Sequence, residues 1–314
     1  MPLCRTKYNR YNMKSFEKER ICEESFRAGG PYWHLYTPGN VTTAFLLNEN
    51  DFTFAMNVVY FAYQWAAGIR ILAFELMSNH LHILIEGEAE AVCRFFASLR
   101  KKLARGLASD RITVPDSFVM QLKAVEDLRS LRNTIGYIHR NGYVVNGNHT
   151  PFSYPWGTNR YFYNDYPITE TFEKIYTGRR RLMFRGRAPE ISDSTKYLDG
   201  YVAPVSYCSL GRGMSMFRDA HHYFSIVGKN VEAYGELALE LNDGDCITDE
   251  EAFSRTVKIC NTIYPGIRIR DLDKTRKTEI ARKLHYEIHC SNGQIRRVLG
   301  LSQFEVESLF PKTP

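Results

Sequence analysis

Residues 69–86 read Ile69-Arg-Ile-Leu-Ala-Phe-Glu-Leu-Met-Ser-Asn-His80-Leu-His82-Ile-Leu-Ile-Glu86. Two runs rich in apolar residues flank Ser78 and Asn79, two residues that favour tight turns. We therefore expect a β-hairpin with strands over 69–77 and 80–85. Because side chains two apart in a strand share a face, His80 and His82 point one way. Leu81, Ile83 and Ile85 then point the other way, into a core.

The segments around this hairpin extend it into a mixed pattern of strands and helices. Strands are expected over 32–37 and 118–125, and helices over 52–67, 91–105 and 127–141, the last stopping at Gly142. The order strand, helix, strand, strand, helix, strand predicts an α+β fold with a ferredoxin-like antiparallel sheet. Two helices would cover one face of that sheet, and the other face would stay free for a site.

The chain has 314 residues, which is enough for two domains of ordinary size. We expect a basic N-terminal arm over 1–27, a sheet domain over 28–166, a basic linker over 167–199 and a mostly helical domain over 200–314. The arm and the linker could contact DNA. They could equally be solvated segments, because short charged stretches usually are.

Composition narrows the class of protein. Apolar residues make up 44% of the chain and charged residues 24%, as in a folded soluble protein. The net charge of +6 permits a nucleic-acid partner without demonstrating one. No apolar run is long enough to span a bilayer, so no membrane is expected. The seven cysteines form no C-x-x-C pair, and together with the lack of a signal peptide they favour the cytoplasm.

His80 and His82 are the first candidates for chemistry. Two imidazoles side by side on an open sheet face can hold one divalent metal ion. The alternative is a pair of surface histidines with no ligand, and the spacing alone does not decide between the two.

The helix over 127–141 supplies the second candidate. Its apolar stripe is formed by Leu128, Leu131, Ile135 and Ile138, and Tyr137 lies well over 90° away from it. Asn141 follows four residues later on the same side as Tyr137. One helix therefore offers a hydroxyl and an amide oxygen together. An exposed tyrosine followed by a capping asparagine would give the same pattern.

Three stretches together resemble the REP-associated tyrosine transposases of the HUH single-strand transposase superfamily. They are Glu75-Leu-Met-Ser-Asn-His80-Leu-His82-Ile-Leu-Ile-Glu86, Tyr137-Ile-His-Arg-Asn141 and Tyr154-Pro-Trp156-Gly-Thr-Asn-Arg-Tyr161. All three occur in the order of that family, and the resemblance, which extends over residues 32–166, covers somewhat under half of the chain. The resemblance implies that residues 28–166 form an HUH nuclease and transposase domain.

The resemblance implies a role for each matching residue. His80, His82 and Asn141 would hold Mg²⁺ or Mn²⁺, and Tyr137 would be the nucleophile that forms a 5′-phosphotyrosine. A tyrosine has an ordinary pKa of about 10 and needs the positive field of a metal to act as a phenolate. The family usually has proline after the asparagine, whereas this chain has Gly142.

The implied partner is single-stranded or hairpin DNA, and the protein is expected to be a monomer or a weak dimer. Two basic surfaces could track phosphates. They are formed by Arg94, Lys101, Lys102 and Arg105 on the helix over 91–105, and by Arg179, Arg180 and Arg181. Trp156 and Tyr161 could stack on bases, although core packing is the commoner role of such residues.

The C-terminal helices admit two interpretations. Ser291 and Ser302 each begin a capping box, and the helix after Ser302 would be the recognition helix of a helix-turn-helix. That helix carries Glu305 and Glu307 and no early basic residue, so a structural three-helix bundle fits as well. For the whole chain, a DNA-binding regulator without cleavage and a water-dependent metal nuclease are the alternatives to a transposase.

Overall fold

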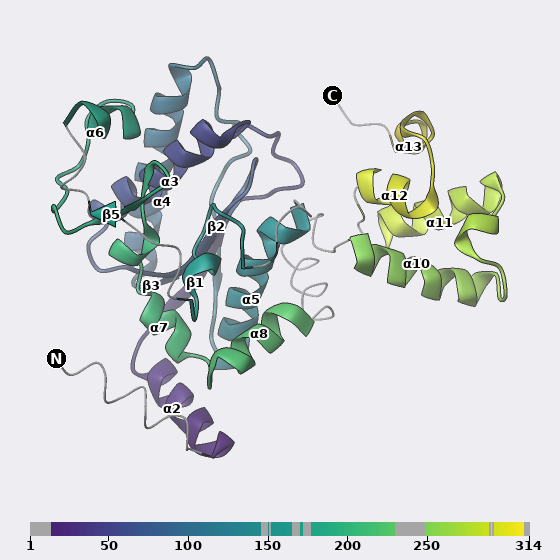
Figure 1. Ribbon diagram of the computed structural model, residues 1–314, viewed down its shortest axis with the longest axis horizontal. Helices are drawn as coiled ribbons and strands as arrows, with labels where there is room; N and C mark the ends of the chain where they lie inside the picture. The colour runs from purple at the N-terminus through teal and green to yellow at the C-terminus, as the bar shows by residue number, and fades with distance from the viewer. Residues whose placement is uncertain are drawn as a thin grey trace. The chain divides into compact units, whose positions relative to one another are not determined.

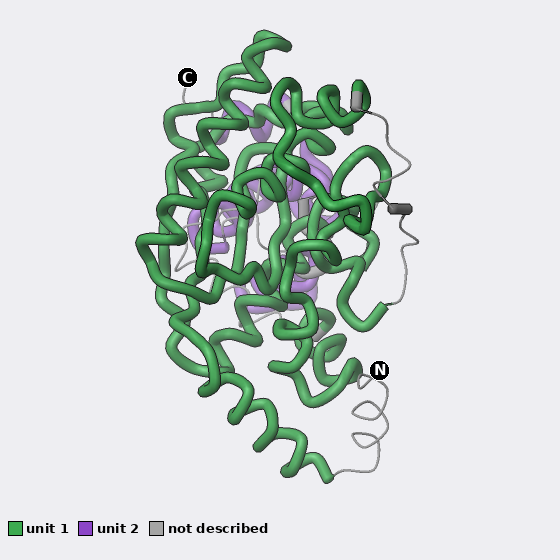
Figure 2. Tube along the Cα trace, turned by 90° about the vertical axis from the view of Figure 1, so that its left-hand side faces the viewer, with its two compact units in different colours: residues 1–142, 149–230 green, residues 143–148, 231–314 purple. Residues whose placement is uncertain are grey.

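A computed structural model describes residues 14–145, 150, 152–164, 170–171, 177–229, 249–288, 290 and 292–310. The chain divides into two compact units, coloured separately in Figure 2. Unit 1 contains residues 1–142 and 149–230, and unit 2 contains residues 143–148 and 231–314. Among the described residues, no helix has the length and apolarity needed to cross a membrane.

A four-stranded antiparallel sheet forms the centre of unit 1 (Figure 1). Its strands are β1 (Tyr32–Tyr36), β2 (Arg70–Leu76), β3 (Leu81–Glu86) and β4 (Gln121–Ala124), in the order β2-β3-β1-β4. The hairpin of β2 and β3 and the strands β1 and β4 lie within a few residues of their predicted positions. The α+β class is thereby confirmed.

Two long helices cover the first face of the sheet, as predicted. They are α3 (Glu49–Gln64) and α4 (Ala89–Ala108). Leu81, Ile83 and Ile85 of β3 point into this core, where they join the apolar stripe of α4. Helix α3 begins earlier than expected because the side chain of Asn48 accepts hydrogen bonds from the first free backbone N–H groups.

The prediction that the second face stays free is wrong. Helices α5 (Leu128–Val145), α7 (Leu210–Ser215) and α8 (Ala220–Lys229) supply the residues that cover it. Leu131, Ile135 and Ile138 of α5 form the predicted stripe, and they pack with Leu84 of β3 and Phe217 into a second core. The sheet is therefore buried on both faces.

Helix α5 also continues past Gly142, where it was expected to stop. A Cβ atom at Gly142 would lie 2.2 Å from ring atoms of Tyr154. Glycine is needed at this position for the close packing of that ring, and not as the end of the helix. A short 3-10 helix, η1 (Asn159–Tyr161), follows Tyr154.

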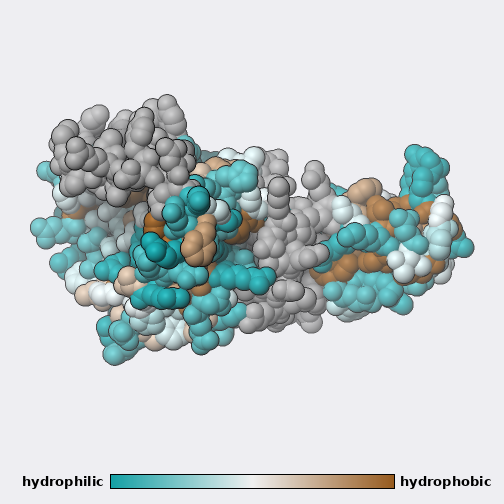
Figure 3. Space-filling model, turned by 90° about the horizontal axis from the view of Figure 1, so that it is seen from below, coloured by the Kyte–Doolittle hydropathy of each residue, from teal (hydrophilic) through white to brown (hydrophobic). Residues whose placement is uncertain are grey.

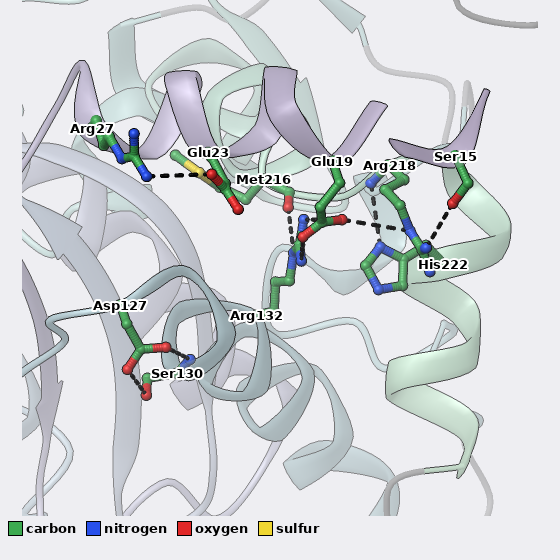
Figure 4. Close-up of polar contacts among 10 residues, drawn as sticks. All are labelled: Ser15, Glu19, Glu23, Arg27, Asp127, Ser130, Arg132, Met216, Arg218 and His222. Atoms are coloured by element: carbon green, nitrogen blue, oxygen red, sulfur yellow. Dashed lines mark hydrogen bonds and ion pairs between the residues drawn. The ribbon is translucent and has the colours of Figure 1, made fainter. Parts of the chain in front are cut away.

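The expected basic arm is in part a docked helix. Residues 1–13 lie outside the described residues, but α2 (Ser15–Arg27) contains four glutamates and packs onto unit 1. Its Glu19 receives two hydrogen bonds from the guanidinium of Arg132 on α5, at 2.6 and 3.3 Å, and Figure 4 shows the two side chains facing each other. The Nε atom of Arg132 donates to the carbonyl of Met216 at 2.6 Å.

Much of the segment expected to be a basic linker is folded. It contains β5 (Glu170–Thr171), α6 (Thr177–Met183) and β6 (Lys196–Leu198), and with β7 (Tyr201–Val202) the strands form a second sheet. The buried side chain of Asn57 connects α3 to this second sheet. It donates a hydrogen bond to Gly200 O at 3.0 Å and accepts one from Val202 N at 3.0 Å.

The boundary between the units accordingly falls later than residue 200. Residues 200–230 belong to unit 1, because side chains of η3 (Pro204–Ser206), α7, α8 and their connections complete its cores. Met216, Phe217 and Tyr223 lie in the second core, beside the stripe of α5.

Unit 2 is helical among its described residues. It contains α10 (Asp249–Ile263), η4 (Ile269–Asp271), α11 (Lys274–Tyr286), α12 (Asn292–Leu299) and α13 (Gln303–Leu309), around a core of its own. The capping box at Ser302 is present, whereas Ser291 lies outside the described residues. Figure 3 shows apolar residues reaching the surface among hydrophilic ones. In unit 2, the side chains of Phe253 and Phe304 are exposed.

Candidate active site

The histidine pair and the tyrosine of the sequence prediction meet at the junction of β3 and α5. The ring centroids of His80 and His82 are 5.2 Å apart, and those of His82 and Tyr137 are 5.1 Å apart, each pair in an edge-on arrangement. The surface-histidine interpretation is excluded, because His82 is 0% exposed and His80 only 4%. Tyr137 is 1% exposed and is absent from the apolar clusters, so it faces the histidines rather than the core stripe.

Sequence reasoning missed two members of this cluster, His34 and Tyr36 on β1. The Nε2 atom of His34 lies 3.0 Å from Nδ1 of His82, and the Tyr36 ring stacks on His82 at 6.0 Å. Both belong to the same sheet face because Tyr36 is paired with His82 in the register of β1 and β3. Their alternation in Tyr-Trp-His-Leu-Tyr was visible, but its relevance depended on the strand order.

The loop after β1 fixes the position of His80. Asn79 Oδ1 lies 2.6 Å from His80 Nδ1, and the Asn79 amide donates to the carbonyls of Gly39 and Thr42 at 2.7 Å each. A Cβ atom at Gly39 would come within 2.7 Å of the same Nδ1, so the loop can approach this closely only with glycine. Asn79 therefore does more than make a turn: it links His80 to the loop.

Glu75 is the third residue that the sequence analysis left without a role. It is fully buried, and it lies opposite His82 in the pairing of β2 and β3. Its Oε2 atom accepts a hydrogen bond from Gly142 N at 2.8 Å. Burial raises the pKa of the Glu75 carboxyl well above its usual value, although the bond from Gly142 opposes this shift.

The Glu75–Gly142 bond brings the end of α5 onto the strand that faces His82. Asn141, next to Gly142, is 3% exposed, and its Nδ2 atom has no hydrogen-bond partner in the described part of the chain. A proline at position 142 would remove the N–H that Glu75 accepts. The departure from the family pattern at this position thus coincides with a buried contact that only a non-proline residue can make.

The donor atoms at this junction fit a divalent metal ion with an oxygen ligand. Each histidine is held through Nδ1 by a neighbour, the arrangement that orients metal-binding imidazoles and directs Nε2 toward the ion. Within the described ranges, no group of three His, Cys, Asp or Glu side chains could hold a metal. A third protein ligand from this part of the chain would therefore be another kind of oxygen donor, such as an amide, a hydroxyl or a backbone carbonyl.

The third matching stretch has a structural role. Gly157 forms a bridge with Glu75, and Thr158 exchanges hydrogen bonds with the backbone of Phe74. Trp156 is half-buried and stacks on Phe52 at 5.2 Å, and Tyr161 is 5% exposed. Core packing is thus confirmed for Tyr161, whereas Trp156 packs on Phe52 and keeps part of its surface exposed.

His139, in the middle of the second stretch, is also a packing residue. Its ring is completely buried between the hydroxyls of Tyr223 and Thr158, each 2.8 Å from a ring nitrogen. Burial lowers the pKa of His139 to about 3, so the ring is neutral at ordinary pH.

The basic residues predicted to contact DNA are separate from this junction. Arg94, Lys101 and Arg105 are exposed on α4, whereas Lys102 lies 4.9 Å over the ring of Phe61. Because α4 and α5 cover opposite faces of the sheet, the α4 surface does not adjoin Tyr137.

The arginine run belongs to α6. Arg179 donates to the hydroxyl of Tyr197 at 2.8 Å, and Arg180 pairs with Asp193 at 3.3 Å. Arg181 is exposed. The role of these side chains in DNA binding stays a prediction.

Comparison with known proteins does not show a family. No protein-family model matches the chain, and no curated protein does. Among solved structures, a REP-associated tyrosine transposase bound to a REP hairpin is similar at 11% sequence identity, with 55% of this chain and 94% of the other covered. The TM-score is 0.34, which indicates at most a distant structural relation.

Proposed function

We propose that this protein cleaves and rejoins single-stranded DNA through a covalent 5′-phosphotyrosine at Tyr137. The observation that carries the proposal is the contact of the Tyr137 ring with His82, at 5.1 Å, where α5 meets β3. This contact supports the proposal because a metal ion held by the histidines would supply the positive field that a tyrosine needs to act as a nucleophile.

The fold that we propose for unit 1 is the ferredoxin-like HUH fold. It is supported by the strand order β2-β3-β1-β4 and by helices α3 and α4, which connect β1 to β2 and β3 to β4. For unit 2 we propose a helix-turn-helix relation as the finer class, on the strength of the Ser302 capping box between α12 and α13.

We assign the metal site to Nε2 of His80, Nε2 of His82 and the side-chain oxygen of Asn141. Bound there, Mg²⁺ or Mn²⁺ would neutralise a phosphate oxygen and favour the phenolate form of a tyrosine. Asn79 and His34 keep the two imidazoles oriented through Nδ1. The donors do not fix the choice of metal, because imidazole also suits zinc.

The Tyr137 oxygen would attack the phosphorus and displace the 3′ oxygen of the preceding nucleotide. The phenol loses its proton and the departing oxygen gains one, so the step is balanced without an oxidant or a nucleoside triphosphate. Since one phosphoester replaces another, the reverse attack by a 3′-hydroxyl rejoins the strand. The substrate we propose is a structured, hairpin-forming DNA.

Access to Tyr137 is the condition on this mechanism. Its side chain is 1% exposed, and His82 is completely covered. A phosphodiester can reach the hydroxyl only if DNA binding displaces part of the covering structure. Cleavage should therefore depend on a DNA-induced rearrangement of unit 1.

The decisive experiment is a covalent-adduct assay with hairpin oligonucleotides from the DNA around the gene. A label at the 3′ end should stay with the protein on a denaturing gel, and a label at the 5′ end should be released, with Mn²⁺ or Mg²⁺ but not with EDTA. Tyr137→Phe should abolish the adduct. Tyr36→Phe is the matched control, because this second tyrosine also contacts His82 and should keep it.

Two outcomes of this assay would contradict the proposed mechanism. An adduct that survives Tyr137→Phe would refute the assignment of the nucleophile. Cleavage without any adduct in that variant would indicate a nuclease that uses water.

A DNA-binding regulator without cleavage is the second candidate, and the complete burial of His82 and Tyr137 favours it. In that case the histidine cluster would be a packed remnant whose hydrogen bonds stabilise the sheet. Specific binding of a hairpin oligonucleotide, with no adduct under any metal condition, would support this alternative.

A further inference from the structure

A groove of about 830 Å³ lies within unit 2, which does not contain the histidine cluster. It is formed by α10, α11, α12 and the segment over 266–270. Helix α13, which sequence analysis singled out as the recognition helix, contributes none of its lining. The lining combines an apolar floor with cationic side chains.

Four cations line this groove: Arg268, Arg270, Lys277 and Arg297. None of the described residues that line it is acidic. The nearby Asp271 pairs with Arg268 at 2.7 Å and with Arg270 at 3.7 Å, and it is 47% exposed. The described lining carries four cations and no carboxylate, with Asp271 beside it, so the complement of the groove is a polyanion.

The floor supplies apolar surface that a simple anion would not use. Phe253 is 50% exposed, and Val257, Ile267 and Val298 are half-buried around the groove. A ligand that covers this surface needs flat or apolar groups as well as negative charge. Unpaired nucleobases joined by phosphates meet both requirements.

We propose that this groove binds single-stranded nucleic acid, with phosphates at the four cations and unpaired bases against Phe253 and the aliphatic floor. Three of the four cations are arginines, whose planar guanidinium groups can both bind phosphate bidentately and stack on bases. A duplex would leave the floor uncovered because its bases are already stacked inside. The site is independent of Tyr137, and it would serve the regulator as well as the transposase.

The test uses the full-length protein and a fluorescent oligothymidylate of about 20 nucleotides, which gives room for more than one groove contact. The groove variant is Arg268→Gln, Arg270→Gln and Arg297→Gln combined. The matched control is Lys258→Gln, Arg282→Gln and Arg296→Gln, which removes the same charge from exposed positions of α10, α11 and α12 that do not line the groove. Binding is measured by fluorescence anisotropy over a series of salt concentrations.

The groove variant should bind at least tenfold more weakly, and its salt dependence should fall by about 2 in log–log slope, since each phosphate contact with a single strand contributes about 0.7. The control should lose less than threefold. Phe253→Ala should weaken binding roughly fivefold or more while leaving the salt slope unchanged, because it removes stacking and not charge. Far-UV circular dichroism checks that each variant remains helical.

Equal losses in the groove variant and the control would overturn the proposal, since net charge alone would then explain binding. Tighter binding of a duplex of matched length would also overturn it. Displacement of the oligonucleotide at lower concentration by an acidic peptide that contains leucines would instead identify a protein partner. None of these results bears on the adduct assay, so the two proposals fail separately.

Discussion

Arg132→Met is expected to lower the free energy of unfolding of unit 1 by about 2–4 kcal/mol. The substitution removes three hydrogen bonds, two to Glu19 and one to the carbonyl of Met216. Breaking a buried ion pair by removing one partner costs about 3–5 kcal/mol, whereas an exposed pair contributes about 0–1 kcal/mol. Arg132 is 9% exposed and Glu19 35%, so the loss should fall between these limits.

The lowered pKa of Glu19 also indicates that its ion pair with Arg132 stabilises unit 1. Burial pushes this pKa up, but the hydrogen bond and charge of Arg132, together with Arg218, lower it below its usual value. The carboxylate is therefore held in its charged form against the cost of partial desolvation. The pair docks α2 onto α5, the helix that carries Tyr137.

Tryptophan fluorescence during urea unfolding measures this loss selectively, because Trp33, Trp65 and Trp156 all lie in unit 1. Arg20→Met is the control. Arg20 lies on α2, the helix that carries Glu19, and the side chains of its ion pair with Glu24 are 67% and 64% exposed. It should change the unfolding free energy by less than about 0.5 kcal/mol. The reasoning is refuted if Arg132→Met stays within that limit, or if the control costs as much.

Three further substitutions test the packing and protonation of the site. Gly142→Ala should destabilise unit 1 by about 1–3 kcal/mol, since the added methyl group meets the Tyr154 ring at 2.2 Å. Glu75→Gln should become more stable relative to the unsubstituted protein as pH rises above about 4.5, because a raised pKa in the folded state makes ionisation unfavourable there. His139, with its pKa lowered to about 3, gives stability that is present above pH 6.5 and is lost as pH falls toward 3. His139→Gln should flatten this acid slope, whose limit is about 1.4 kcal/mol per pH unit for one group.

Each of these has a control within unit 1. Gly228→Ala places its methyl group in open space on α8 and should be neutral or slightly stabilising. Glu90→Gln and His221→Gln change exposed side chains and should leave the pH profiles unaltered. Urea unfolding by tryptophan fluorescence at a series of pH values covers all six variants. A Gly142→Ala protein as stable as Gly228→Ala, or parallel pH profiles throughout, would contradict the assignments.

The hairpin and the first core could be predicted because their signals are local. Alternation through Leu81, Ile83 and Ile85 fixes which residues face α4, and the stripe of α5 follows from helical spacing. The position of Tyr137 away from that stripe followed in the same way. These patterns need only the geometry of one element at a time.

Burial of the site could not be predicted because the covering residues are distant in sequence. Phe217 and Tyr223 reach the second face from a segment that looks like the beginning of another domain. Likewise, the place of His34 in the histidine cluster could not be predicted, because it depends on the strand register that puts Tyr36 opposite His82. The many basic residues around α6 suggested a solvated linker. The segment is nevertheless folded, because Phe184 and Tyr197 are buried beside them.

The position of α4 has a consequence for the path of a bound substrate. Arg94, Lys101 and Arg105 lie beyond the sheet from Tyr137, so two packed layers, on the order of 20 Å in total, separate them from its hydroxyl. A phosphate held by α4 cannot be the phosphate that is attacked, and a strand that reaches both must pass around an edge of the sheet. Short oligonucleotides would then be processed without any help from α4, and only longer ones would benefit from its charge.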